Sequence, residues 1–419
     1  MTKSRRCGIS VDIGTTNITL HLTSLDSDAL INEITFRNPQ DDYAGDEIIS
    51  RIDFARSPDN AKLLTTIVRQ SISDGIAKLL QDSMVDKDTI DSVVIVGNTV
   101  MHHLFFGLST NSLLKPPYRA EYKDSMVTTS SKVGLTLKND PFCYSPPLIE
   151  SFIGADAVAM MLVSGFLETE SGLVSIDVGT NTEIAAINDG KIWIASAASG
   201  PAFEGMSVEC GTSGDEGAIS KVCIDPSDLH PRYVTIGNRK ATGICGTGVV
   251  SAIASMLETR VLLPRGSFDR SQKNPWLVTD EAITHYILAP AIETAINSHI
   301  ILTQPDIRML QQSKASIRSA LSQVLQNARL DPDEVSTLFL TGVFGTGLSV
   351  PDAVRIGLFP EMANAEVIQV KSGASQGADL LHQENYREYA NELVTKTNYI
   401  ELTDNPAFKK EFTENLPFP

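Results

Sequence analysis

The chain has 419 residues, 42% of them hydrophobic, which is enough for about two or three domains with cores of ordinary size. Its formal net charge of −17 argues against nucleic acid and anionic membranes as partners, because their surfaces would repel it. No secretion signal opens the sequence and no apolar run is long enough to span a bilayer, so we expect a cytoplasmic protein. The five cysteines form no C-x-x-C pair or Cys/His cluster, and neither a zinc site nor an iron–sulfur cluster is indicated.

An acidic, glycine-containing turn is the first pattern along the chain. It reads Val11-Asp12-Ile13-Gly14-Thr15-Thr16 and lies between strand-like runs at 9–13 and 18–25, which predicts a hairpin. The glycine lets the backbone come close to a bound group, and threonine hydroxyls and backbone N–H groups can hold phosphate oxygens. The carboxylate of Asp12 is a candidate ligand for Mg²⁺, directly or through water.

Three further elements are expected before residue 100. They are a strand at 31–36, an amphipathic helix at 60–81 and a buried strand at 92–96. The last strand ends in Gly97-Asn98-Thr99, where another helix begins. Ligands collect at the carboxyl ends of strands in open α/β sheets, so the Asn98 amide is a candidate site group. The same tripeptide also fits a plain turn and helix cap.

The acidic turn then occurs a second time, as Ile176-Asp177-Val178-Gly179-Thr180-Asn181, between strand-like runs at 173–178 and 182–187. One such turn is expected by chance in many proteins, but two in the same strand–turn–strand setting are informative. Two hairpins facing each other across a cleft would grip a nucleotide's phosphates from both sides. We place the domain crossover between them, with an N-terminal lobe at 1–168 and a C-terminal lobe at 169–419.

The second half continues with a strand at 191–197 and an irregular, glycine-rich insertion at 201–240. A glycine-rich turn containing Gly246 then opens a helix at 249–257. These glycines could admit a phosphate or nucleoside at the helix N-terminus, or could serve only the close packing of the helix start.

A long amphipathic helix is expected from Thr303, because Thr303-Gln-Pro-Asp306 resembles a capping box. A polar row that includes Gln311 and Lys314 runs beside its apolar stripe and is either a solvated face or a wall facing a nucleobase. A strand at 336–340 and the loop Thr341-Gly342-Val343-Phe344-Gly345-Thr346-Gly347 follow. Gly342 and Gly345 could let an adenine or ribose lie against the backbone.

These elements and a late small-residue turn at 372–378 resemble, in order, the five-part layout of the actin-like (ASKHA) ATPase superfamily. The resemblance implies an α/β fold of two ribonuclease-H-like lobes with Mg-ATP in the cleft between them, and last helices that pack back on the first lobe. Segments supporting a closer resemblance are Asn38-Pro-Gln with Ile49-Ser-Arg-Ile52, Val96-Gly-Asn-Thr-Val-Met-His-His103, Ile153-Gly-Ala-Asp-Ala157, Ala198-Ser-Gly-Pro-Ala-Phe-Glu-Gly205, Cys245-Gly-Thr-Gly248, Thr303-Gln-Pro-Asp-Ile-Arg308, Ile356-Gly-Leu-Phe-Pro360 and Leu416-Pro-Phe-Pro419.

Together these segments look like the ATPase portion of the reductive activators of corrinoid enzymes. In that family, ATP helps to drive an uphill electron transfer that returns a cobalt(II) corrinoid to cobalt(I). The well-known members carry an iron–sulfur domain that has no counterpart here. We therefore expect no iron–sulfur cluster in this chain and a separate low-potential electron donor. The partner implied is a corrinoid protein of a methyltransferase system, and a homodimer is left open.

The resemblance assigns roles to residues of the two turns. Asp12 and Asp177 would hold Mg²⁺ or its waters, and Glu183 or Asn98 would orient the attacking water, with Glu204 a further candidate. An outward, structural Glu183 is the rival interpretation of its place in an alternating strand. The phosphate cradle would comprise Gly14, Thr15, Thr16, Gly179, Thr180 and Asn181.

Two other function classes remain open from the sequence. One is a kinase of a small sugar or carboxylic acid on the same fold. The other is a chaperone-like switch that binds nucleotide and turns it over slowly.

Overall fold

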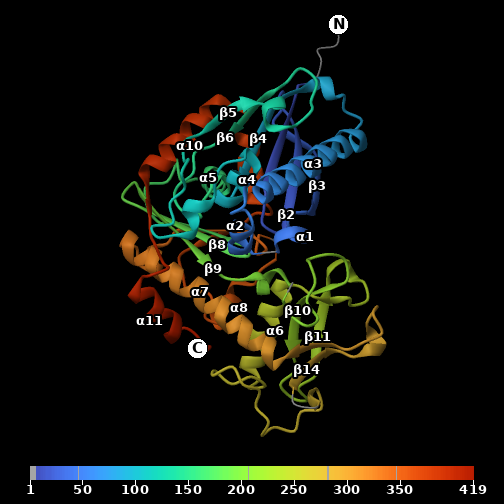
Figure 1. Cartoon of the computed structure of the whole chain (residues 1–419). Helices are drawn as coiled ribbons and strands as arrows, with labels where there is room; N and C mark the ends of the chain where they lie inside the picture. Colours follow the sequence, from blue (N-terminus) through green and yellow to red (C-terminus); the bar gives the residue numbers. More distant parts are fainter. Residues whose placement is uncertain (1–5, 46, 206, 281–282, 346) are drawn as a thin grey trace. The chain divides into compact units, whose positions relative to one another are not determined.

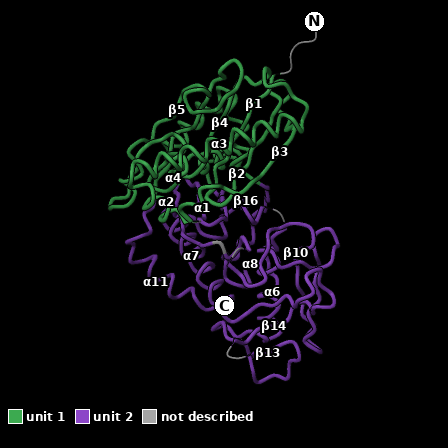
Figure 2. The backbone as a smooth tube through the Cα atoms, turned by 45° about the vertical axis from the view of Figure 1, so that its right-hand side comes forward, with its two compact units in different colours: residues 1–171, 189–192, 372–399 green, residues 172–188, 193–371, 400–419 purple. Residues whose placement is uncertain are grey.

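The computed structural model describes residues 6–45, 47–205, 207–280, 283–345 and 347–419 (Figure 1). The chain divides into two compact units, coloured separately in Figure 2. Unit 1 comprises 1–171, 189–192 and 372–399, and unit 2 comprises 172–188, 193–371 and 400–419. The lobe boundary at 168/169 stays a prediction. In the part of the chain that the structure describes, no helix has the length and apolarity required to cross a membrane.

Unit 1 is built on a six-stranded sheet of order β3-β2-β1-β4-β6-β5. β1 pairs antiparallel with β2 and parallel with β4, so a hairpin is followed by a crossover connection. The strands are β1 (Cys7–Ile13), β2 (Asn17–Ser24), β3 (Ala29–Arg37), β4 (Ile90–Gly97), β5 (Met126–Thr129) and β6 (Phe142–Ser145). The helices are α1 (Asp41–Ala44), α2 (Ile48–Phe54), α3 (Pro58–Asp82), α4 (Thr99–Phe106), α5 (Ala155–Val163), α9 (Gly373–Leu380) and α10 (Glu384–Lys396).

Unit 2 repeats this plan with strands in the order β17-β16-β7-β8-β9. β7 pairs antiparallel with β8 and parallel with β16, as β1 does with β2 and β4. The strands are β7 (Leu173–Val178), β8 (Asn181–Asn188), β9 (Lys191–Ala198), β16 (Thr337–Gly342) and β17 (Glu366–Gln369). The two hairpins predicted from the acidic turns are therefore confirmed, together with the duplicated topology around them.

The region expected to be an irregular insertion at 201–240 is folded, which corrects the sequence analysis. β10 (Ala218–Ile224) and β11 (Pro231–Thr235) pair antiparallel, and β12 (Gly243–Ile244) completes a small sheet. Ile219, Val222 and Ile224 are buried in the core of unit 2, so apolar burial holds these strands despite the many glycines nearby. A second small sheet, which the sequence analysis did not predict, contains β13 (Leu277–Asp280), β14 (Ile283–Ala289) and β15 (Ile300–Thr303).

The helices of unit 2 pack on strands of its main or small sheet or on each other. They are α6 (Gly246–Glu258), α7 (Gln304–Ala328), α8 (Val350–Arg355) and α11 (Pro406–Glu414). The remaining short elements are β18 (Thr397–Tyr399), which follows β9 in the sheet order, and the 3-10 turns η1 (Lys87–Thr89), η2 (Asn111–Leu114), η3 (Ser131–Val133), η4 (Pro201–Glu204), η5 (Ile236–Asn238), η6 (Ala291–Glu293) and η7 (Pro332–Glu334). The predicted start of α7 is confirmed, because the Thr303 hydroxyl accepts from the Asp306 N–H at 3.2 Å and the Asp306 carboxylate accepts from the Thr303 N–H at 2.8 Å.

Candidate functional site

The loop of the first hairpin is held from behind by two side chains. The carbonyl of Gly14 accepts a hydrogen bond from Asn38 Nδ2 at 2.9 Å, and the carbonyl of Thr15 accepts from Arg51 Nη2 at 2.5 Å. In a trans peptide the N–H points opposite to the C=O. The N–H groups of Thr15 and Thr16 therefore point away from Asn38 and Arg51, which is the arrangement an anion-binding loop needs.

The loop of the second hairpin is held in the same way, inside unit 2. The carbonyl of Gly179 accepts from Ser199 Oγ at 3.0 Å, and the carbonyl of Thr180 accepts from the Gly200 N–H at 2.9 Å. The N–H groups of Thr180 and Asn181 consequently point away from Ser199 and Gly200. Ser199 directly follows β9, just as Asn38 directly follows β3, so the same position of the repeat supports both loops.

Asp12 lies near the end of β1, opposite Val96 of β4, and its carboxylate accepts a hydrogen bond from Ser375 Oγ at 3.0 Å. Burial raises the pKa of Asp12 to about 6, although the Ser375 hydrogen bond and the positive charge of His21 act in the other direction. A carboxylate so poorly solvated is one that a bound cation stabilises. The chemistry of Asp12 therefore fits a Mg²⁺ ligand.

A buried polar network joins α9 to β1 and β2 beside this carboxylate. Asp379 accepts from Ser10 Oγ at 2.6 Å and from Thr23 Oγ1 at 3.0 Å, and His21 Nδ1 lies 2.7 Å from its other oxygen. The ring of His21 is only 2% exposed. These contacts fix α9, and with it Ser375, against the strands that form the first hairpin.

The charge on His21 predicts how stability depends on pH. Burial opposes protonation, but the hydrogen bond and charge of Asp379, with the charges of Glu33 and Asp12, outweigh it and raise the pKa of His21. A raised folded-state pKa gives stability that is complete below about pH 6.5 and is lost as the pH rises through the raised value. Asp379→Asn should therefore cost more free energy of unfolding at about pH 5.5 than at about pH 8.

Urea unfolding of the wild type and of Asp379→Asn at both pH values measures this difference. The matched control is Asp280→Asn, which removes a surface carboxylate 3.8 Å from His285 and should show little dependence on pH. Equal losses from Asp379→Asn at the two pH values would contradict a charged His21.

Asn98 caps α4, which confirms the turn-and-cap interpretation. Its Oδ1 accepts from the N–H groups of Val100 at 3.1 Å and Met101 at 3.0 Å. Its Nδ2 donates to Thr15 Oγ1 at 3.1 Å, so the cap also touches the first loop. A role in orienting water stays a prediction.

The two candidate glutamates of unit 2 have different neighbours. Glu183 lies opposite Asp177 in the hairpin, and its carboxylate accepts from Ser196 Oγ of β9 at 2.9 Å. Glu204 accepts from Thr180 Oγ1 at 2.7 Å, within the second loop itself. Burial raises the pKa of Glu204, while the hydrogen bonds from the hydroxyl and N–H of Thr180 act against this.

The glycines of the predicted nucleoside loops pack closely against the chain. Gly342 has φ +67°, and a side chain there would overlap the Val178 carbonyl and the Asp177 carboxylate, which places the end of β16 directly against the second hairpin. A side chain at Gly246 would overlap the Phe203 carbonyl, and one at Gly345 the Val370 carbonyl. Close packing is therefore confirmed at Gly246, and contact with a nucleoside stays a prediction. Thr346 lies outside the described residues.

Gln311 and Lys314 contact residues 416–417, close to the C-terminus. Gln311 Nε2 donates to the Leu416 carbonyl at 2.9 Å, and Lys314 Nζ donates to the Pro417 carbonyl at 2.6 Å. Burial, followed by the charge of Arg318, lowers the pKa of Lys314 to about 8. The expectation that Gln311 and Lys314 face a nucleobase stays a prediction.

Both parts of the chain are similar to known proteins. Residues 172–419 match the family model described as the C-terminal domain of RACo, the ASKHA domain, and residues 7–169 match the RACo middle region. A solved structure of a reductive activator for corrinoid, iron–sulfur protein superposes with a TM-score of 0.91 at 28% identity, covering 100% of this chain and 67% of that one.

Two curated relatives are similar along most of the chain. The corrinoid activation enzyme RamQ of Eubacterium limosum is 30% identical over 420 residues, which span 98% of this chain and 70% of that protein. The [Co(II) methylated amine-specific corrinoid protein] reductase of Methanosarcina barkeri is 26% identical over 395 residues, which span 85% of this chain and 66% of that protein.

Proposed function

The chain belongs to the RACo family, and from that membership we propose that it binds Mg-ATP, hydrolyses it and thereby activates a corrinoid protein. The observation that carries the proposal is the equivalent backing of the two loops, where Asn38 and Ser199 hold the carbonyls of Gly14 and Gly179. Loops fixed in this way present successive N–H groups to a phosphate.

Residues of both hairpins would contribute to nucleotide binding, some to the metal ion and others to the phosphates. Asp12 and Asp177 would hold Mg²⁺, directly or through water, and the ion would neutralise charge on the phosphates. Among the residues that the structure describes, no group of three or more His, Cys, Asp or Glu could hold a metal by itself. The N–H groups of Thr15, Thr16 and Asn181 would cradle the phosphates, and Thr180, a further candidate for the cradle, donates to Glu204.

The names of the relatives indicate the work to which hydrolysis would be coupled. RamQ is a corrinoid activation enzyme, and the second relative is a reductase of a cobalt(II) corrinoid protein. We propose that this chain helps to return the cobalt(II) corrinoid of a methyltransferase system to cobalt(I), with one electron supplied by a separate low-potential donor. The chain spans 70% and 66% of the two relatives, so this activity is proposed for it and not transferred from them.

ATP hydrolysis by the purified protein tests the proposal. It is measured with and without a cobalt(II) corrinoid protein and an external low-potential reductant, while the corrinoid spectrum is followed in the same cuvette. We expect the partner to stimulate hydrolysis and cobalt(I) to appear, and Asp12→Ala to abolish both. Slow turnover that the corrinoid protein does not stimulate would contradict the proposal. Small sugars and carboxylic acids would then be tested as phosphoryl acceptors.

A further inference from the structure

Glu204 lies directly on the second loop, at the end of η4 (Pro201–Glu204). Its Oε1 accepts a hydrogen bond from Thr180 Oγ1 at 2.7 Å and would be 3.7 Å from a Cβ atom built on Gly179. The backbone N–H of Thr180 also donates to this carboxylate. A carboxylate therefore contacts the loop that the proposed function assigns to phosphate.

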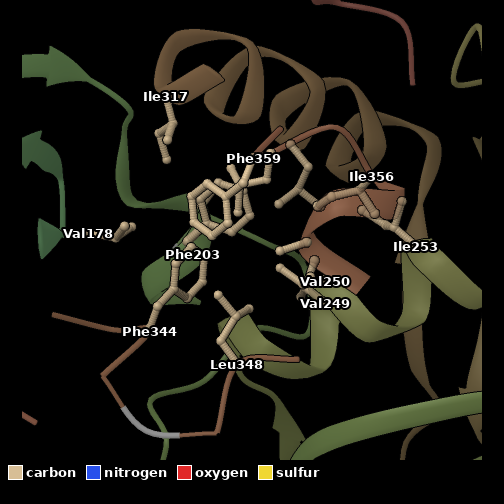
Figure 3. Close-up of a cluster of buried hydrophobic side chains, with 14 of the residues drawn as sticks. Val178, Phe203, Val249, Val250, Ile253, Ile317, Phe344, Leu348, Ile356 and Phe359 are labelled. Carbon is tan, nitrogen blue, oxygen red and sulfur yellow. The ribbon is translucent and has the colours of Figure 1, made fainter. Parts of the chain in front are cut away.

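The backbone that carries Glu204 is fixed by its neighbour, Phe203. The Phe203 ring is 2% exposed and packs edge-on against Phe344, with ring centroids 5.2 Å apart. Figure 3 shows both rings in a buried cluster with Val178, the residue before Gly179. The Phe203 carbonyl also fills the space beside Gly246 at the start of α6. Glu204 is thus held in place by the core that supports the second loop.

We propose that Glu204 is the general base of ATP hydrolysis and that Thr180 is the positioning residue that orients it. The inference rests on the proposed function and deepens it. In the step, the water oxygen forms a bond to the γ-phosphorus while the bond from that phosphorus to the β–γ bridging oxygen breaks. ADP takes the bonding electron pair, and a proton of the water passes to the Glu204 carboxylate.

Three features favour Glu204 over Glu183 for this role. Glu204 contacts the second loop directly through Thr180, and the Glu183 carboxylate accepts from Ser196 Oγ of β9. Two donors of one residue, Thr180, orient the Glu204 carboxylate, as a third group orients the base in many hydrolases. Burial also raises the pKa of Glu204, which brings it closer to the pH at which a base is efficient.

A competing role follows from the same contacts. In accepting from both donors of Thr180, the Glu204 carboxylate occupies groups that would otherwise bind a phosphate oxygen. If the Glu204 carboxylate only takes the place of a phosphate oxygen on this loop, then removing its charge would strengthen nucleotide binding and leave hydrolysis intact.

Single-turnover hydrolysis of Mg-ATP by Glu204→Gln, with the full chain in excess, separates these roles. The amide has the shape of the carboxylate and can still accept from Thr180, but it cannot take a proton. We expect the rate to fall about 10²–10⁴-fold while nucleotide affinity changes by less than about threefold. The fall in rate at acidic pH, which protonation of the Glu204 carboxylate causes in the wild type, should be absent from Glu204→Gln. The matched control, Glu209→Gln, removes an exposed carboxylate of the same segment and should leave both values unchanged.

A double-mutant cycle tests the role of Thr180. Thr180→Val should slow hydrolysis with little change in affinity, and Glu204→Gln/Thr180→Val should be no slower than Glu204→Gln alone, because the two residues act as one unit. Additive losses, or a loss of affinity in Thr180→Val, would overturn the positioning role.

Three outcomes would contradict the role of Glu204 as general base. They are a wild-type rate for Glu204→Gln, a loss confined to Glu183→Gln, and tighter nucleotide binding by Glu204→Gln with hydrolysis intact. A wild-type protein that binds Mg-ATP but does not hydrolyse it would reject the proposed function and this inference together. The first three outcomes reject only the inference, so the two failures are distinguishable.

Discussion

Replacing Arg51 with methionine should destabilise the protein by about 3 kcal/mol, the lower end of the range for breaking a buried ion pair. The Arg51 side chain is 0% exposed and pairs with Asp41, which is 2% exposed. Removing the guanidinium group leaves the Asp41 carboxylate buried without this partner. The Thr15 carbonyl also loses the hydrogen bond from Arg51. The cost falls at the low end because Arg37 still holds the other carboxylate oxygen of Asp41, at 2.9 Å.

Urea unfolding of Arg51→Met measures this loss. Adding Asp41→Asn to the same chain should recover part of it, because the stranded charge is removed. The control is Arg56→Met, which breaks a surface pair with Asp53 and should cost about 0–1 kcal/mol. An Arg51→Met protein as stable as the control would contradict a structural role for the buried pair.

Replacing Phe418 with alanine should cost about 3–4 kcal/mol, although the residue lies in the last four of the chain. Its ring is 3% exposed, its N–H donates to the Pro264 carbonyl at 2.8 Å, and Lys314 Nζ lies 5.3 Å from the ring centroid. Truncation leaves a cavity in the core of unit 2 and removes the cation–π contact to a buried ammonium group.

Denaturant unfolding of Phe418→Ala and of Phe412→Ala compares a buried with a half-buried phenylalanine of the same segment. The Phe412 variant should lose about 1 kcal/mol or less. A loss of about 1 kcal/mol or less in Phe418→Ala, similar to that in Phe412→Ala, would contradict a stabilising role for the burial of Phe418. The hydrogen bonds from Gln311 and Lys314 to the carbonyls of residues 416–417 would then need an explanation other than the anchoring of Phe418.

The sequence could predict the elements whose cause is local. A strand, an acidic turn and a second strand lie within about 20 residues in each hairpin, and the capping residues of α7 lie within one turn, so pattern alone identifies them. The support of the first loop could not be predicted in this way. Asn38 and Arg51 reach Gly14 and Thr15 from outside the hairpin, and nothing in their local sequence states that contact.

The wrong expectation for residues 201–240 has a related cause. Glycines near Gly205 and Gly217 indicate loops, but β10 is held by its burial against α6 and by its pairing with β11, and neither is visible in a window of sequence. Glu204 is likewise linked to the second loop by a contact that no local pattern states. Its link to Thr180 spans 24 residues and depends on the position of η4 after β9.

The equivalent backing of the two loops has a consequence for the energetics of ligand binding. Fixing the backbone of one residue costs about 1–2 kcal/mol of conformational entropy, which a flexible loop would lose each time a ligand arrives. Here Asn38 and Ser199 immobilise Gly14 and Gly179 during folding, each within its own unit. The entropy of ordering is lost once, when the chain folds, and more of the free energy of each binding event would remain for the proposed activation of a partner.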